Sequence, residues 1–449
     1  MKQIQQNPRR VLIAIIVVAV VLRVMAALYL GNEVTPLPGI ADQDSYHALA
    51  QRVLGGHGFS FGEPWWPATR AGEPTAHWSF LYTLYLAAVY AVFGVNPLVA
   101  RLIQAVAVGI LYPLLIYRLT LRLFAARPQP VRAEATPAVL VGLGAAGITA
   151  VYIYFIYYAG ALMTESLFIL AIVWSFDVAV QVSQAERPSA RQWLLLGLAL
   201  GVTVLLRQLF LLFVPFLLLW LGWTQWWRGV RGRLWQLALP LVVIVALMLP
   251  WTVRNYRAFG MVVPLNTNSG YAFFWGNHAI HGTRFVPILS AKTYGELLPP
   301  ELLHLNEAEL DSALLDLALA EVFADPWRYF LLSLSRIPPY FTFWPTADSS
   351  LLSNLSRLFS FGLFLPFFLY GLWRSLRMRF ASLRDWLASP WTLIYLFMLV
   401  YTGIHVLTWT LIRYRLPVDA FLTLFGGLAL VRLAAWMTAR RVEKMATTN

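Results

Sequence analysis

The chain has 449 residues, of which 59% are hydrophobic and only 12% are charged. Soluble globular domains carry charge on about a quarter of their residues. This composition therefore excludes a soluble protein and a large soluble catalytic domain, and it indicates an integral membrane protein. The absence of cysteine from the sequence also excludes a disulfide framework, a thiolate nucleophile and a cysteine-based zinc site.

The net charge of +13 would suggest a nucleic-acid partner in a soluble chain, but in a membrane protein lysine and arginine first report topology. Six basic clusters belong in the cytoplasm by the positive-inside rule: Arg9/Arg10, Arg118/Arg122/Arg127/Arg132, Arg187/Arg191, Arg228/Arg231/Arg233, Arg374/Arg377/Arg379/Arg384 and Arg440/Arg441/Lys444. We therefore expect no nucleic acid to bind. The low use of lysine beside arginine is typical of a GC-rich bacterial genome, so we expect a bacterial cytoplasmic (inner) membrane protein.

Eleven apolar segments follow one another at about 11–30, 77–94, 97–119, 137–158, 161–181, 192–206, 208–227, 233–252, 354–373, 391–411 and 416–436. The first is about 20 residues long and has no small-residue cleavage site, so we interpret it as a retained helix with a cytoplasmic N-terminus. Two full crossings at 77–94 and 97–119 would place the Arg118 cluster outside. One of these two segments is therefore expected to be short, broken or interfacial, leaving ten or eleven transmembrane helices in an all-α polytopic fold.

Two long loops, 31–76 and 253–350, fall on the external side in this topology. The chain divides into a transmembrane module, 1–252, that carries the first loop, then the second loop, and then C-terminal transmembrane helices over 351–449. The same topology places Glu165, Arg207 and the stretch from Arg413 to Pro417 near the external face. The polar and charged candidate residues are thus expected to lie together on the external side of the membrane.

The first loop holds two carboxylates, Asp42 and Asp44, at the start of a predicted short helix in the membrane plane that ends at Gly55-Gly56. A carboxylate here can act as a general base or bind a divalent cation such as Mg²⁺ or Mn²⁺. The alternative is that both residues only cap the helix and oppose its dipole.

Six sequence strings, in this order, resemble the GT-C glycosyltransferases of the type that includes protein O-mannosyltransferases and bacterial aminoarabinose transferases. They are DQDSYHALAQRVLGGHGFSF, LAAVYAVFGVNPLVARLIQAV, YYAGALMTESLFIL, GLALGVTVLLRQLFLL, PWTVRNYRAFGMVVPLNTNSGYAFFWGN and RYRLPVDAFL. The resemblance implies a GT-C-like helical bundle. It also implies transfer of a sugar from a polyprenyl phosphate carrier to a glycan, lipid or protein acceptor outside the cytoplasm.

By position, Asp42 matches the catalytic aspartate of that family, and Asp44 is an alternate base or a metal ligand. Glu165 matches the family's second acidic position, and an acidic residue at membrane depth is a functional candidate. The alternative for Glu165 is a helix N-terminal carboxylate beside a capping Thr164.

The resemblance points to arginines for the leaving phosphate, because a guanidinium gives bidentate, permanently charged contacts to phosphate oxygens. The alternative for each arginine is snorkelling to lipid headgroups. The arginine candidates are Arg207, Arg254, Arg413 and Arg415. Their neighbours Asn255 and Tyr414 are further candidates for substrate binding.

The second loop carries a polar and aromatic run whose composition suits a carbohydrate surface, although asparagine and glycine there could simply form turns. Its candidates are Asn268, Tyr271, Asn277 and His278, and His77 in the first loop could orient the phosphate or the acceptor, or sit in the interface beside Trp78. The histidine spacings fit no metal-ligand motif. An amphipathic stretch from about Asn306 to Ala324 predicts a docked helix that covers the site.

The sequence therefore favours a polyprenyl-phosphate-sugar-dependent glycosyltransferase. Two other function classes stay open. One is a secondary transporter or lipid-carrier flippase, although transporters place polar groups at the midplane of broken helices and here most charge lies in loops. The other is a sugar-binding or scaffold membrane protein.

Overall fold

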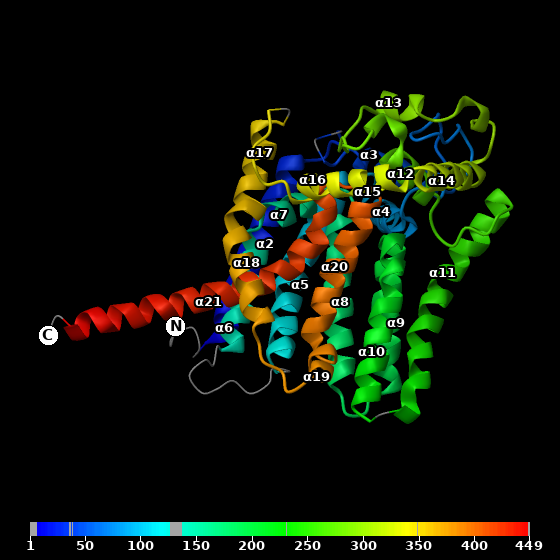
Figure 1. The fold of residues 1–449 in the computed structure, drawn as a ribbon. Coiled ribbons are helices and arrows are strands. Elements are labelled where there is room, and N and C mark those ends of the chain that lie inside the picture. Colours follow the sequence, from blue (N-terminus) through cyan, green and yellow to red (C-terminus); the bar gives the residue numbers. More distant parts are fainter. Residues whose placement is uncertain are drawn as a thin grey trace.

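The computed structural model describes residues 7–35, 37, 39–125, 137–229, 231–347 and 349–447. Helices and the loops between them make up this part of the chain, and its only β contacts are two isolated bridges, Ser60 with Pro74 and Trp65 with Thr69. Figure 1 shows a bundle of long helices with shorter helices gathered across one end. The predicted all-α fold is confirmed.

The eleven apolar segments all form helices in the described structure. Ten of the segments contain α2 (Pro8–Leu30), α5 (Pro97–Ala125), α6 (Ala138–Val151) together with α7 (Ile153–Gly160), α8 (Glu165–Gln184), α9 (Ala190–Leu206), α10 (Val214–Trp227), α11 (Ala238–Phe259), α18 (Leu363–Leu376), α20 (Pro390–Leu407) and α21 (Leu416–Thr447), and the remaining one is α4 (Phe80–Phe93). Within the described ranges, eight helices, some with a preceding turn, are long and apolar enough to cross a membrane. The α6–α7 pair, bent by 54°, brings the number to nine if it is one span. This is fewer than the ten or eleven expected from the sequence, because α4 and α9 are shorter apolar helices. The chain is a multi-span membrane protein.

Helix α4 (Phe80–Phe93) is the shorter of the two neighbouring apolar segments at 77–94 and 97–119. It has 14 residues, whereas α5 has 29. At 1.5 Å per residue α4 is only about 21 Å long, against a hydrocarbon core of about 30 Å. The prediction that one member of this pair is short is therefore confirmed.

The shorter helices come from the two long loops (Figure 1). They are α3 (Gln43–Leu54), α12 (Ser269–Asn277), α13 (Ala291–Glu296), α14 (Glu307–Ala324), α15 (Pro326–Ser335) and α16 (Ile337–Phe341). Helix α14 is the predicted amphipathic stretch, and Asn306 opens it with a capping box to Glu309. Helix α3 ends at Gly55, as the glycine pair predicted.

A break at Tyr152 separates α6 from α7, and Arg23 of α2 stabilises it. The Arg23 side chain is fully buried and donates hydrogen bonds to the carbonyl oxygens of Thr149 at 2.8 Å and Ala150 at 3.4 Å. These carbonyls end α6 and have no helical partner, so the guanidinium acts as their cap. This contact accounts for a charged side chain inside the first apolar segment.

In the C-terminal half of α8, Asp177 pairs with Arg118 at 3.0 Å and with Arg122 at 2.8 Å. These two arginines belong to a basic cluster assigned to the cytoplasm from the sequence. The other two members, Arg127 and Arg132, lie outside the described residues.

Candidate active site

The loop helices and the end of the bundle enclose a cavity of about 2620 Å³. Its walls come from the first long loop, α7, the second long loop and the connection between α20 and α21. Eight of the residues predicted from the sequence line it: Asp42, Asp44, His77, Arg207, Asn268, Tyr271, Arg413 and Tyr414.

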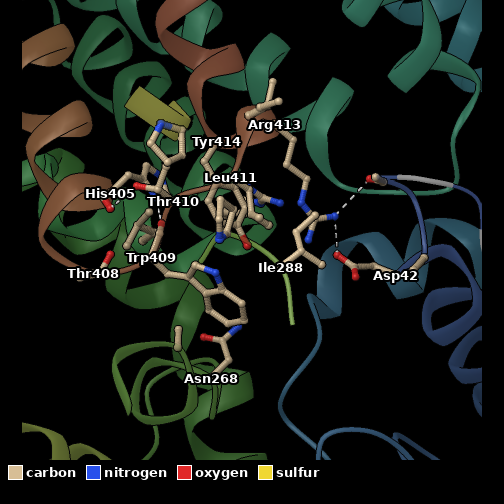
Figure 2. Close-up of a pocket in the computed structure, with 18 of the residues that line it drawn as sticks. Asp42, Asn268, Ile288, His405, Thr408, Trp409, Thr410, Leu411, Arg413 and Tyr414 are labelled. Atoms are coloured by element: carbon tan, nitrogen blue, oxygen red, sulfur yellow. Dashed lines mark hydrogen bonds and ion pairs between the residues drawn. The ribbon is translucent and has the colours of Figure 1, made fainter. Parts of the chain in front are cut away.

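Two acids and two arginines alternate beside this cavity, and three of them line it: Asp42, Arg207 and Arg413. Asp42 Oδ2 lies 2.8 Å from Arg413 Nη1, and Arg413 Nε lies 3.7 Å from Glu165 Oε1. The same Glu165 oxygen accepts a hydrogen bond from Arg207 Nη2 at 2.5 Å. Figure 2 shows the Arg413 side chain reaching across to Asp42. We call these four side chains the ion-pair row, and their charges sum to zero.

Neither acid in the ion-pair row caps a helix with its side chain. Asp42 occupies the N-cap position of α3, but its carboxylate accepts no backbone N–H there. Thr164 precedes α8 without capping it, and its hydroxyl instead accepts a hydrogen bond from Arg207 Nε at 3.2 Å. The structure therefore favours interactions between side chains over the capping alternative for Asp42 and Glu165.

Tyr414 lies between the two arginines of the ion-pair row. Its ring centre is 5.4 Å from the guanidinium carbon of Arg207 and 5.4 Å from that of Arg413. The ring also stacks on His405, with centroids 4.7 Å apart. These cation–π and stacking contacts hold both guanidinium groups at the cavity wall.

Asp44 lines the cavity two residues beyond Asp42. Its Oδ1 atom is buried without a hydrogen-bond partner, and burial raises the pKa of its carboxyl group. No group of three or more His, Asp or Glu side chains placed to hold a metal ion occurs among the residues that the structure describes. Asp42 and Asp44 alone fit a divalent cation poorly, because Asp42 is already paired with Arg413.

His77 and Asn268 join the two long loops at the cavity. His77 Nδ1 lies 3.2 Å from the carbonyl oxygen of Thr267, and burial lowers the pKa of the imidazole. Asn268 donates to the carbonyl of His77 at 3.2 Å and accepts from Gln208 at 2.7 Å. Gln208 was missed by the sequence analysis, although its place beside Arg207 in the RQ pair was a usable signal.

The structure places two predicted arginines away from the cavity. Arg254 donates to the carbonyl oxygens of Thr75 at 2.9 Å and Phe59 at 3.1 Å, and so ties the first loop to α11. Arg415 is fully buried and pairs with Asp419 at 2.9 Å inside the bundle. Both guanidinium groups are occupied by the chain itself, so their predicted contact with phosphate gains no support.

Three predicted polar residues also serve the protein's own packing. Asn255 is fully buried and donates to the carbonyl of Leu265 at 2.8 Å. Asn277 is fully buried too, and its side-chain oxygen accepts from Arg336 at 2.7 Å. His278 begins the short 3₁₀ turn after α12 and caps it with its ring nitrogen. None of the three lines the cavity.

No protein-family model matches the sequence, and no curated protein matches it. Solved structures do match the fold. The oligosaccharyltransferase AglB from Archaeoglobus fulgidus, in complex with an inhibitory peptide and a dolichol-phosphate, aligns with a TM-score of 0.59 and 15% identity over 99% of this chain and 52% of that one. The apo form of ArnT from Cupriavidus metallidurans aligns with a TM-score of 0.52 and 16% identity over 97% of this chain and 62% of that one.

The chain has the GT-C fold. The resemblance stated from the sequence strings is confirmed at the level of fold. The chain spans about half of the AglB length and about three fifths of the ArnT length.

Proposed function

We propose that this GT-C chain is a membrane glycosyltransferase that moves a sugar from a polyprenyl-phosphate-linked donor to an acceptor on the extracytoplasmic face. The single observation that supports it most is the ion-pair row on the wall of a large cavity. That arrangement supplies an acid–base group and two guanidinium cations beside a space for two substrates. The AglB structure of the same fold holds a dolichol-phosphate, which supports a lipid-linked donor here.

In the proposed reaction Asp42 is the general base. Its carboxylate takes the proton from an acceptor hydroxyl or amine as the acceptor atom forms a bond to the anomeric carbon of the donor sugar. The bond between that carbon and the phosphate oxygen breaks, and the electron pair leaves with the polyprenyl phosphate. The transition state is oxocarbenium-like, so the developing charge on the phosphate needs nearby cations.

Arg413 links the base to the leaving group. In the structure it neutralises Asp42, which keeps that carboxylate occupied. A donor phosphate offers the guanidinium a bidentate partner, and Glu165 holds it from the other side. We propose that donor binding moves Arg413 from Asp42 to the phosphate and so frees the base before the acceptor reacts. Arg207 fixes Glu165 in place for this exchange.

Part of the cavity wall is apolar and suits the isoprenoid tail of the donor. Its side chains come from α2, the broken α6–α7 span and the segment after Arg207, and include Ala26, Ile153, Ile156, Leu211 and Leu212. The break at Tyr152 turns α7 so that its residues line the cavity, which gives the bent span a purpose in this proposal.

The test is donor turnover by the purified protein in lipid nanodiscs, with polyprenyl-phosphate sugars extracted from the source membrane as substrate. Asp42→Asn should lower release of free polyprenyl phosphate by at least about 100-fold, the scale of a lost general base, in protein that still elutes as a folded species on size exclusion. Asp316→Asn, on the exposed face of α14, is the matched control. A near-wild-type rate for Asp42→Asn would remove that residue from the mechanism.

The same preparation tests the transporter alternative. Reconstituted liposomes that take up or flip the lipid-linked sugar with no covalent product would contradict the transferase proposal. A new glycosylated product with release of polyprenyl phosphate supports it.

A further inference from the structure

Five aromatic side chains form a continuous wall on the cavity, which we call the aromatic wall: Trp66, Trp78, Tyr271, Trp275 and Trp409. Trp66 stacks on Trp275 with ring centroids 5.3 Å apart, and Trp78 lies 6.3 Å from Trp66. Tyr271 and Trp409 contact Trp275 at 5.3 Å and 5.9 Å. Segments from both long loops and from the α20–α21 connection thus meet in one surface.

Three polar atoms of this wall are buried and have no hydrogen-bond partner. They are Trp66 Nε1, Trp78 Nε1 and the Tyr271 hydroxyl. Trp78 is 7% exposed and Tyr271 is 1% exposed. Leaving a buried donor unpaired is unfavourable, and native proteins rarely do so without a reason. Trp275 makes the contrast, because its Nε1 donates to the Tyr294 carbonyl at 3.0 Å.

The side-chain amides next to the wall, in contrast, already make hydrogen bonds within the protein. Asn266 donates to the carbonyl oxygens of Ala76 at 3.0 Å and Trp78 at 2.8 Å. Asn268 is likewise engaged by His77 and Gln208. Within the aromatic wall, the buried hydrogen-bonding groups without a partner are therefore Trp66 Nε1, Trp78 Nε1 and the Tyr271 hydroxyl.

The chemistry of these free groups restricts what they bind. An indole N–H only donates, so a ligand must present acceptor oxygens to Trp66 and Trp78. Stacking covers the facing surfaces of Trp66 and Trp275, so these two ring faces are closed to a cation.

The charged groups behind the wall are already occupied. Glu307 accepts hydrogen bonds from the Ala76 N–H at 2.7 Å and the Thr69 hydroxyl at 2.8 Å. Asp311 accepts from the backbone N–H groups of Gly270 at 2.8 Å and Tyr271 at 3.1 Å.

We infer that the aromatic wall is a subsite for an uncharged sugar ring, whose hydroxyl oxygens accept hydrogen bonds from Trp66 and Trp78 and pair with the Tyr271 hydroxyl. A sugar with an ammonium group would place donors against donors, and one with a carboxylate would bring a charge to a wall whose nearby charged groups are paired. The inference deepens the proposed function, on which it rests for the identification of this ligand as a substrate.

The binding test is independent of catalysis. Saturation-transfer NMR on the protein in nanodiscs would use methyl glycosides of neutral hexoses and pentoses, a methyl glucosaminide and a methyl glucuronide. We expect the neutral glycosides to bind, and the glucosaminide and the glucuronide to bind at least about tenfold more weakly. The combined variant W66F/W78F/Y271F keeps an aromatic ring at each position but removes the three polar groups, and should weaken neutral binding by about tenfold or more. Trp235→Phe, at an exposed position in η3 (Arg231–Leu237), is the control.

Equal binding of charged and neutral glycosides, no binding of any neutral glycoside, or full binding by the triple variant would each overturn the inference. Asp42→Asn separates the two proposals, because it should abolish transfer and leave glycoside binding intact. Competition with a polyprenyl-phosphate hexose, but not with bare polyprenyl phosphate, would show that the wall holds the donor sugar. Glycosylation of the bound methyl glycoside would show that it holds the acceptor.

Discussion

Arg413 is shared by Asp42 and Glu165, and the exchange proposed above depends on that sharing. Its side chain is 13% exposed, and that of Glu165 is 2% exposed. Removing one member of a buried pair leaves the other charge uncompensated, which costs about 3–5 kcal/mol. The row is therefore expected to respond as a unit rather than residue by residue.

Arg413→Gln removes the charge that faces both acids. Donor turnover should fall by at least about 100-fold, because the phosphate loses its mobile cation. Arg413→Lys should recover only part of this rate, since an ammonium cannot bridge two carboxylates with a planar fork. Arg284→Gln is the control, because Arg284 lines the same cavity and is exposed. Wild-type turnover in Arg413→Gln would contradict the exchange.

His77 makes the join between the loops sensitive to acid. Burial lowers its pKa below the usual 6.5, against weaker opposing effects of Glu307 and Asp42. Below pH 6.5 the imidazole of His77 is protonated in the unfolded chain but stays neutral in the folded one, so the free energy of unfolding decreases as the pH falls. We expect the melting temperature to drop between about pH 7 and pH 5, and His77→Gln to flatten that slope. His304→Gln, at an exposed position, should leave the slope unchanged.

At the level of residues, the four members of the ion-pair row could be predicted from the sequence. Which of two neighbouring arginines faces the cavity could not. Arg413 and Arg415 stand two positions apart in one RYR string, yet the first reaches Asp42 and the second is buried against Asp419. A string match fixes where the backbone lies, and it does not fix which way each side chain points. The same limit explains why Arg254 and Asn277 were predicted at the site while Gln208 was missed.

At the level of elements, the first turn of α14 joins the two long loops. Glu307 accepts hydrogen bonds from the Ala76 N–H at 2.7 Å and from the hydroxyls of Thr69 at 2.8 Å and Thr267 at 2.5 Å. Thr267 in turn holds the ring of His77. One carboxylate thus fixes the distance between the loops and the orientation of a cavity residue.

Glu307→Ala leaves three buried donors without a partner, each at a cost of about 1–3 kcal/mol. We expect a loss of at least about 2 kcal/mol in stability and faster proteolysis within the loops. Thermal melts and limited trypsin digestion measure both effects. Glu296→Ala, whose side chain is 62% exposed, should change neither. A silent Glu307→Ala variant would show that the loops are held by other contacts.

Helix α14 could be predicted because its apolar stripe and its Asn306 cap are local signals. The break at Tyr152 could not, since neither proline nor glycine stands there. It depends on Arg23, more than a hundred residues earlier in the chain. A bend created by a distant cap leaves no trace in the local pattern.

At the level of the whole molecule, glycines let the long helices of the bundle approach closely. A Cβ atom at Gly427 of α21 would lie 2.5 Å from the Val141 carbonyl oxygen of α6 and 2.6 Å from the Ala145 nitrogen. Small residues at such crossings allow tight packing within membranes. The close crossing of α6 and α21 therefore requires a residue without a side chain at this position.

Gly427→Ala should lower the melting temperature by several degrees in detergent, because overpacking of this kind costs about 1–3 kcal/mol. Gly147→Ala, on α6 with open space around it, should be neutral or slightly stabilising. Fluorescence-detected size exclusion after heating compares the two directly. Equal melting would mean that the helices can separate at no cost.

The number of apolar segments and the convergence of Asp42, Glu165, Arg207 and Arg413 could both be predicted from the chain. The aromatic wall could not, because Trp66, Trp275 and Trp409 lie in three separate segments and tryptophan at helix ends is usual in membrane proteins. Only their arrangement in space distinguishes them from an interfacial belt.

The pairing of Asp42 with Arg413 also bears on how the proposed reaction ends. The donor phosphate is a diester, whereas the polyprenyl phosphate left after transfer is a monoester that carries more negative charge near neutral pH. Guanidinium groups would hold this product more tightly than the starting material and slow each cycle. An internal carboxylate that reclaims Arg413 competes with the product for the same cation. The ion pair of the resting protein would thus drive product release, and weakening it would appear as inhibition by polyprenyl phosphate.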